Sequence, residues 1–291
     1  MDNCQVIQVR LGDLSESVIE AIKRETKHYT VPLVINETPL GSGTLVTIDG
    51  HFGILTAEHV VRHPSKPELH LTNVSHNGPR LVIPPMDSPA DIGFESFALR
   101  VLTTQRRRDE YGPDLAFIVL PASGALNEIR ARRSFYPLAK AADAKTEEAL
   151  HDTGFIAFCG FLGSKQTEEP GALGFSKVIQ LGGYAFLTGP ENYEQRDRWD
   201  YFELGVRREE MGEFGNSFGG VSGGGVWRVP VYLKKGDAVG AEYFERMTFA
   251  GVAFYEENHL PRGRFFVRTH GPRSIYQTFL PEIREQLNAG R

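Results

Sequence analysis

Residues 41–55 have the sequence GSGTLVTIDGHFGIL. Two apolar runs in this stretch flank the dipeptide Asp49-Gly50. An Asp-Gly pair between two apolar runs is a strong local signal for a β-hairpin, because the tight turn needs residues that tolerate positive φ angles. The stretch therefore predicts two antiparallel strands early in the chain.

Short apolar runs separated by turn residues continue along most of the chain. Further strands are expected at 31–35, 68–72, 80–83, 96–102, 115–120, 155–162, 177–187, 201–206, 225–229 and 247–254. A helical pattern occurs only near the ends: Asp13 is expected to cap a helix over 13–29, and Pro281 either kinks a helix over 274–287 or opens a final short one. This distribution favours an all-β barrel or sandwich architecture.

The segment 121–152 differs from the strand-rich blocks on either side of it. It contains Pro-Ala-Ser-Gly, then a charged stretch and a stretch rich in Ala, Lys and Glu. We interpret it as a linker between two β-barrels. The expected domains are an N-terminal helical extension at 1–29, a first barrel at 30–120, the linker at 121–152, a second barrel at 153–272 and a C-terminal helix at 273–291.

Composition excludes several classes of protein. The formal net charge of −5 gives no basic field, so nucleic-acid binding is not expected. The only cysteines are Cys4 and Cys159, which argues against a disulfide framework and for a reducing compartment. The first residues lack the apolar segment of a secretory signal, and no apolar run approaches the ~18 residues of a membrane span. We therefore expect a cytoplasmic protein that does not enter a membrane.

Three segments carry side chains suited to acyl transfer. His59 follows the apolar run 53–57, Asp114 directly precedes the run 115–120, and Ser222 lies within the glycine-rich stretch 219–225. A serine hydroxyl needs an adjacent base, a histidine can take and return its proton, and an aspartate can orient the imidazole. Glycines let backbone N–H groups approach the developing oxyanion. These residue types therefore predict a catalytic triad.

The same segments resemble the motifs of a known family. Residues 56–59 (TAEH), 114–116 (DLA) and 220–224 (GVSGG) are similar to the His, Asp and Ser motifs of trypsin-like serine proteases, which have the chymotrypsin fold, and they occur in the family's order. The stretch 41–44 (GSGT) resembles the strand that leads to the His motif, notably in bacterial Deg-type proteases. The resemblance spans about residues 30–270, and nothing after it resembles an appended peptide-binding domain.

The resemblance implies a fold, a mechanism and a site. The fold is two six-stranded antiparallel β-barrels with helical extensions at both ends. The activity is serine endopeptidase, with His59, Asp114 and Ser222 as the triad and the backbone N–H groups of Gly220 and Ser222 as the oxyanion hole. No cofactor and no metal are implied. The partners expected are a protein or peptide substrate and an unidentified regulator of a cytoplasmic protease.

Departures from the family pattern affect activation and specificity. Val221 stands where secreted members carry an aspartate that pairs with a newly cut N-terminus, so zymogen activation of that kind is not expected. The resemblance places Asn216 at the floor of the substrate pocket and Ala253, Phe254 and Tyr255 in its wall. Because Asn216 carries no charge to pair with Lys or Arg, we expect an uncharged residue before the scissile bond.

Three other readings compete with the triad. His59 and His63 form H-x-x-x-H, but the residue after the first His is Val60 and not the glutamate of a zinc protease. Residues 220–224 also satisfy the G-x-S-x-G nucleophile elbow of esterases, with Asp237 and His259 or His270 as formal partners, although that elbow must follow a buried strand. The barrels could also form a pseudoprotease that binds a peptide or a partner protein without turnover.

Overall fold

The structure is a computed structural model. It describes residues 14–72, 78–84, 91–104, 112–141, 155–161, 167–170, 177–180, 183–207, 219–232, 243–244, 246–259 and 264–289.

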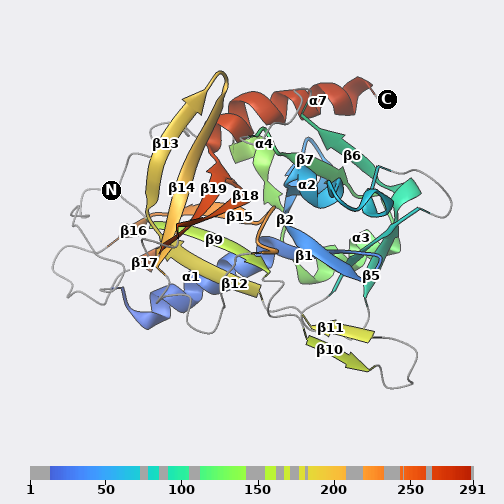
Figure 1. Cartoon of the computed structure of the whole chain (residues 1–291), viewed down its shortest axis with the longest axis horizontal. Helices are drawn as coiled ribbons and strands as arrows, with labels where there is room; N and C mark the ends of the chain where they lie inside the picture. Colours follow the sequence, from blue (N-terminus) through green and yellow to red (C-terminus); the bar gives the residue numbers. More distant parts are fainter. Residues whose placement is uncertain are drawn as a thin grey trace.

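The first sheet is built from the N-terminal half of the chain (Figure 1). Its strands are β1 (Thr30–Ile35), β2 (Thr38–Ile48), β3 (His51–Thr56), β4 (Arg80–Ile83), β5 (Ile92–Glu95), β6 (Arg100–Thr103), β7 (Ala116–Val119) and β8 (Tyr136–Pro137). They pair in the order β5-β4-β1-β2-β3-β7-β6, and β8 adds to β2. All these pairs are antiparallel except β2–β8.

The hairpin predicted from residues 41–55 is confirmed. Ile48 pairs with His51 across the turn between β2 and β3. Asp49 and Gly50 have φ angles of 48° and 86°, which is the left-handed region that this turn requires. Gly53 on β3 is needed for a second reason: a Cβ there would lie 2.3 Å from the Phe117 ring, so only glycine lets β3 approach β7.

The second sheet is built from the C-terminal half. Its strands are β9 (Phe155–Phe161), β12 (Gly183–Thr188), β13 (Pro190–Arg196), β14 (Trp199–Arg207), β15 (Gly225–Val229), β18 (Thr248–His259) and β19 (Arg264–His270), in the order β12-β9-β15-β18-β19-β14-β13. Two further pairs, β10 (Thr167–Pro170) with β11 (Lys177–Gln180) and β16 (Val231–Tyr232) with β17 (Tyr243–Phe244), form small hairpins.

The helices within the described residues are α1 (Glu16–Tyr29), α2 (Glu58–Val61), η2 (Pro67–Leu69), η3 (Ser96–Ala98), α3 (Gly124–Arg132), α4 (Leu138–Ala141), the π-helical η7 (Arg273–Phe279) and α7 (Leu280–Ala289). The expected all-β architecture of two antiparallel sheets with helices near both ends is therefore confirmed, although the described sheets hold eight and seven strands instead of six each.

Each terminal helix contacts the sheet that is more distant in the sequence. Helix α1 directly precedes the first sheet, yet it lies against β9 and β12 of the second (Figure 1). Helix α7 follows the second sheet, yet Arg284 forms an ion pair of 2.7 Å with Asp49 and Gln286 donates to the carbonyl of Thr103, both in the first sheet. The two ends of the described chain thus tie the sheets together.

An aromatic cluster fills the contact between the sheets. Trp227 lies 5.0 Å from Tyr29, 5.2 Å from Tyr136 and 5.1 Å from Phe249, measured between ring centroids. These residues come from β15, the end of α1, β8 and β18. Trp227, Tyr136 and Phe249 belong to one hydrophobic cluster that continues through the first sheet, and Tyr29 packs against it, so the main core runs across both sheets.

Several local predictions need correction. Residues 68–72 do not form a strand, because Pro67 opens the 3₁₀ turn η2. Ser15 occupies the N-cap position of α1, and Asp13 lies outside the described residues. Pro281 lies in the first turn of α7, so it opens the final helix, which follows directly on η7.

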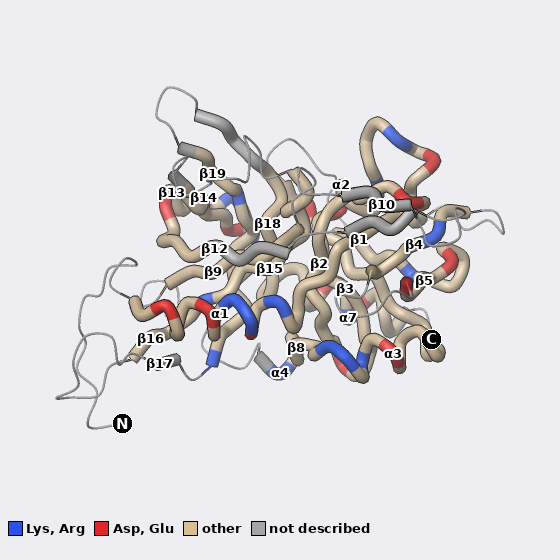
Figure 2. Tube along the Cα trace, turned by 90° about the horizontal axis from the view of Figure 1, so that it is seen from below, with Lys and Arg blue, Asp and Glu red and all other residues tan. Residues whose placement is uncertain are grey.

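Charge is mixed over the surface. In Figure 2, both signs alternate along α1, where Lys23 pairs with Glu20 at 2.8 Å. Within the described residues, no helix is both long and apolar enough to cross a bilayer.

Candidate active site

The segment around His59 is positioned by the end of β3. The strand stops at Thr56, Ala57 takes the N-cap position, and α2 begins at Glu58. Val60 and Val61 are fully buried and anchor this single helical turn, while the His59 side chain stays 19% exposed. The turn therefore presents the imidazole at the surface from a rigid base.

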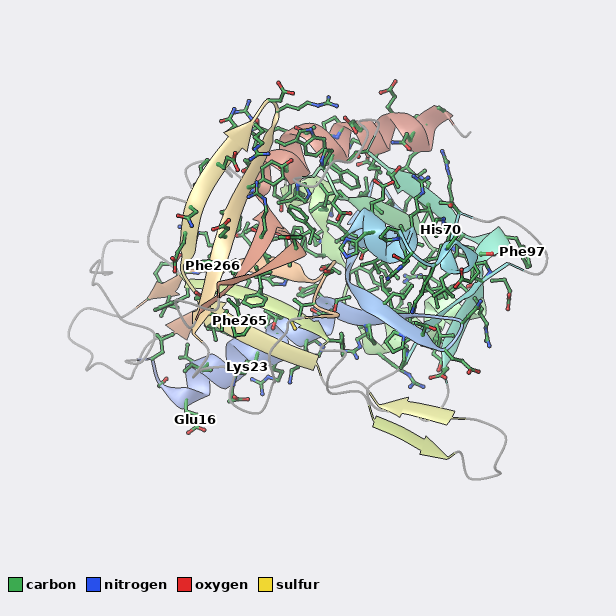
Figure 3. The ribbon with its side chains drawn as sticks, in the orientation of Figure 1. Glu16, Lys23, His70, Phe97, Phe265 and Phe266 are labelled. Atoms are coloured by element: carbon green, nitrogen blue, oxygen red, sulfur yellow. The ribbon has the colours of Figure 1, made fainter. Side chains whose placement is uncertain are left out.

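The Glu58 side chain has a structural role in α2. Its carboxylate pairs with Arg62 at 2.7 Å, one helical turn along α2. A glutamate in the first turn of a helix, four residues before an arginine, favours that helix. Farther along, His70 lies near α2 in Figure 3, and its Nε2 is 2.9 Å from the carbonyl oxygen of His63.

Asp114 holds His59 at two points. Its Oδ2 lies 2.7 Å from Nδ1 of the imidazole, and its Oδ1 accepts the backbone N–H of His59 at 2.9 Å. The carboxylate is fully buried. Because the contact involves both the ring and the main chain of His59, it fixes the orientation of the imidazole and favours the tautomer with a proton on Nδ1.

A second histidine lies behind this pair. Nε2 of His270 accepts the backbone N–H of Asp114 at 3.0 Å. The ring is fully buried and packs against Phe254 at 4.5 Å and Tyr201 at 5.1 Å between centroids. Burial lowers the pKa of His270 to about 3, so the ring is neutral at neutral pH. The sequence suggested His270 only as a formal member of an esterase triad, and no local pattern marks it as the partner of Asp114.

The loop that carries Ser222 is fixed by hydrogen bonds to its surroundings. Gly223 donates its N–H to the carbonyl of Ala253 at 2.7 Å, and Ala253 donates to the carbonyl of Gly224 at 3.0 Å. Gly220 and Gly223 have φ angles of 98° and 86°, which favour glycine. Ser222 itself remains partly exposed on this loop.

The Ser222 loop lies against the strand end that leads to His59. A Cβ on Gly223 would be 2.1 Å from Oγ1 of Thr56 and 3.1 Å from the backbone nitrogen of Ala57. The carbonyl of Ser222 accepts the N–H of Ser42, which lies on β2 beside that strand, at 2.8 Å. The structure thus brings the three segments selected from the sequence to one place.

The residues expected to line the substrate pocket have different surroundings. Ala253 and Phe254 are buried, and Phe254 packs on His270, whereas Tyr255 is 50% exposed on β18. Asn216 lies outside the described residues.

The competing readings fare differently. Nδ1 of His59 faces Asp114, and Nδ1 of His63 accepts the backbone N–H of Ser65 at 3.3 Å. In the described part of the chain, no three His, Cys, Asp or Glu side chains are grouped as metal ligands. Ser222 is followed by strand β15, whereas a nucleophile elbow must be followed by a helix, so the esterase reading does not fit.

Comparisons with known proteins give structural likenesses only. No family model matches the chain, and no curated protein matches it. Among solved structures, human heparin binding protein is similar over 90% of this chain and 92% of its own, with 14% identity and a TM-score of 0.45. Kallikrein-related peptidase 10 is similar over 91% of this chain and 98% of its own, with 12% identity and a TM-score of 0.35. Likenesses this distant say nothing about activity.

Proposed function

We propose that the protein is a serine endopeptidase that uses Ser222 as its nucleophile. The observation that supports this most strongly is the two-point contact of buried Asp114 with His59, beside a glycine-rich loop that carries a partly exposed serine. A purely structural histidine needs no buried carboxylate on both its ring and its main chain, whereas a general base needs both its tautomer and its orientation fixed.

The proposed reaction proceeds through an acyl-enzyme. The Ser222 oxygen attacks the peptide carbonyl while Nε2 of His59 takes the hydroxyl proton, and Asp114 stabilises the imidazolium. The N–H groups of Gly220 and Ser222 stabilise the oxyanion. When the C–N bond breaks, His59 gives the proton to the leaving amine. A water then repeats the sequence on the ester and frees Ser222.

The second sheet offers a place for an extended peptide. Strand β15 pairs with β18 only as far as Val252, and β19 covers the other edge of β18 from Val252 to His259. Among the described strands, none pairs with the free edge of β18 beyond Ala253. An extended peptide could add there as a further strand, and its side chains would alternate across the sheet, as in other strand-addition complexes. This favours a protein or peptide as the substrate.

The state of Cys159 bears on the cell compartment. Cys159 is a free, buried thiol, and burial raises its pKa. In the described part of the chain Cys159 forms no disulfide, which suits a reducing environment, and we propose the cytoplasm.

The test is labelling by a fluorophosphonate probe together with peptide hydrolysis. We expect the wild-type protein to be labelled and Ser222→Ala to be neither labelled nor active. If the wild-type protein binds peptides but is not labelled, the protein is a pseudoprotease. If purified Ser222→Ala retains hydrolysis, the proposed nucleophile is wrong.

A further inference from the structure

Ser42 joins the Ser222 loop to both sheets through its side chain. It lies on β2 and is fully buried. Its hydroxyl donates to the carbonyl of Gly220 at 2.7 Å and accepts the backbone N–H of Phe161, at the end of β9, at 2.9 Å. One small side chain thus connects the first sheet, the second sheet and the loop before the nucleophile.

The main chain of Ser42 adds two more hydrogen bonds to the same region. Its N–H donates to the carbonyl of Ser222 at 2.8 Å. Its carbonyl accepts the hydroxyl of Thr56 at 2.7 Å, and Thr56 ends the strand that leads to His59. Every hydrogen-bonding group of Ser42 is therefore directed at the Ser222 loop or at the strands that enclose it.

The loop needs such a support because of its composition. Gly219 and Gly220 are adjacent, and a peptide unit between two glycines can rotate at little steric cost. The N–H of Gly220 is the proposed oxyanion donor, and its direction relative to the Gly220 carbonyl is set by the φ and ψ angles of that residue. Ser42 holds the carbonyl of Gly220, whose φ angle is 98°, and so fixes the peptide unit that directly follows this N–H.

We propose that Ser42 is a positioning residue for the oxyanion hole: its hydroxyl, held between Gly220 and Phe161, keeps the N–H of Gly220 aimed at the developing oxyanion. This inference rests on the proposed protease function. Ser42 does not touch the substrate, and it acts through Gly220.

The variant Ser42→Ala tests the proposal. Loss of one oxyanion donor typically lowers kcat by about 10²–10³-fold. A donor that is free to turn away should therefore lower kcat by at least about tenfold, while KM changes little. A peptide aldehyde forms a bond from its carbonyl carbon to the Ser222 oxygen, and its own oxygen occupies the oxyanion hole. Its affinity should fall by a factor similar to that of kcat.

The chain offers a matched control in Ser274. This serine is also fully buried, and its hydroxyl donates to the carbonyl of Asp200 and accepts the N–H of Asp200, both at 2.8 Å. Ser274→Ala removes the same two kinds of hydrogen bond in a region that does not contact the Ser222 loop in the described contacts. It should lower the melting temperature as Ser42→Ala does, but leave kcat and aldehyde affinity at wild-type values.

The outcomes separate this proposal from the proposed function. If Ser42→Ala and Ser274→Ala have the same kcat and aldehyde affinity below their melting temperatures, Ser42 is only structural and the proposal is wrong, while the protease function stands. If the wild-type protein neither hydrolyses peptides nor reacts with fluorophosphonate, both the proposed function and the role of Ser42 are wrong.

Should Ser42→Ala fail to fold, Ser42→Cys offers a side chain of similar size with a weaker donor, and an unchanged kcat in that variant would overturn the proposal. The pH at which kcat/KM falls on the acid side should be the same in wild type and variant, because the contact of Asp114 with His59 is intact in both.

Discussion

Asp114 holds His59 through two separate oxygens, Oδ2 at the imidazole and Oδ1 at the backbone N–H, and this determines what an amide would do in the same place. In Asp114→Asn, the amide oxygen would keep the backbone N–H of His59, which Oδ1 now accepts at 2.9 Å. The NH₂ group would then face Nδ1, where Oδ2 now lies at 2.7 Å. Nδ1 would have to accept, so the ring proton would move to Nε2, and His59 could no longer take the proton of Ser222.

We therefore expect Asp114→Asn to fold normally and to lose about 10³–10⁴-fold in kcat, as in other triads whose histidine is forced into the wrong tautomer. Steady-state hydrolysis near pH 8 measures this, and circular dichroism checks the fold. A variant with more than a tenth of wild-type kcat would show that Asp114 does not set the tautomer.

His270 should make the stability of the protein depend on pH. Its pKa is about 3 in the folded state, because burial disfavours the charged ring, and near 6.5 in the unfolded chain. Between these values the unfolded state binds more protons, so the full stability is present above about pH 6.5 and is lost as the pH falls toward 3. At about 1.4 kcal/mol per pKa unit, the loss amounts to as much as roughly 5 kcal/mol.

His270→Gln keeps an acceptor for the N–H of Asp114 but cannot titrate. Urea unfolding at pH 7, 5.5 and 4 should therefore show a smaller decline of the free energy of unfolding in His270→Gln than in wild type. Equal declines in the two proteins would mean that His270 is not the group responsible.

The sequence predicts the role of residues that can be recognised from the residues directly beside them in the chain. His59, Asp114 and Ser222 each lie beside an apolar strand or within a glycine run, and such local settings can be recognised. The roles of Ser42 and His270 depend on contacts across 178 and 156 residues, with Gly220 and Asp114 respectively. The sequence of residues 41–44 predicts a strand, but nothing local to Ser42 indicates where its hydroxyl points.

At the scale of elements, α1 is part of the folded core of the protein. Ile22 on this helix is fully buried and belongs to the main hydrophobic cluster. Ile22→Ala should lower the free energy of unfolding by about 2–5 kcal/mol, whereas Arg24→Ala on the exposed face should change it by less than about 0.5 kcal/mol. Chemical denaturation of the two variants measures the difference, and similar small effects in both would show that α1 is not docked.

Helix α1 and Val221 both bear on how the proposed protease is activated. Val221 is buried, with its Cα 3.0 Å from where a Cβ on Gly160 would lie, and it offers no charge for a new N-terminus. We therefore expect the chain to be active with Met1 in place, and cleavage near residue 30 to destabilise it. An intact chain that is inert until it is cut there would contradict this.

Elements with a clear apolar alternation were predictable, and polar ones were not. The β2–β3 hairpin follows from its two apolar runs and its Asp-Gly turn. Strand β13 has the sequence PENYEQR with no fully buried residue, and it forms because β14 offers it an edge. The wrong strand at 68–72 shows the converse, since its alternation is overridden by the turn that Pro67 opens.

At the scale of the whole molecule, one hydrophobic core extends across both sheets. Trp227 of the second sheet and Tyr136 of the first belong to one cluster, and Tyr276 of η7 donates to the carbonyl of Phe249 at 2.9 Å within it. The two sheets therefore share one core, and β8 of the first sheet lies within the segment 121–152 that the sequence suggests as a linker.

We accordingly expect both sheets to unfold in one transition. Trp199 and Trp227 are both fully buried, so tryptophan fluorescence reports the core, while far-ultraviolet circular dichroism reports the strands. The two signals should give the same midpoint in urea. A first step seen by one signal alone would mean that one sheet is stable without the other.

Because α7 contacts the first sheet, that contact forms only late in synthesis. A ribosome releases β6 and the Asp49 turn long before it releases α7, whose Arg284 pairs with that turn. Until then this flank of the first sheet is uncovered. A nascent chain that already contains Ser222 still lacks the contact between α7 and the first sheet. The ion pair of Arg284 with Asp49 can form only when α7 has left the exit tunnel.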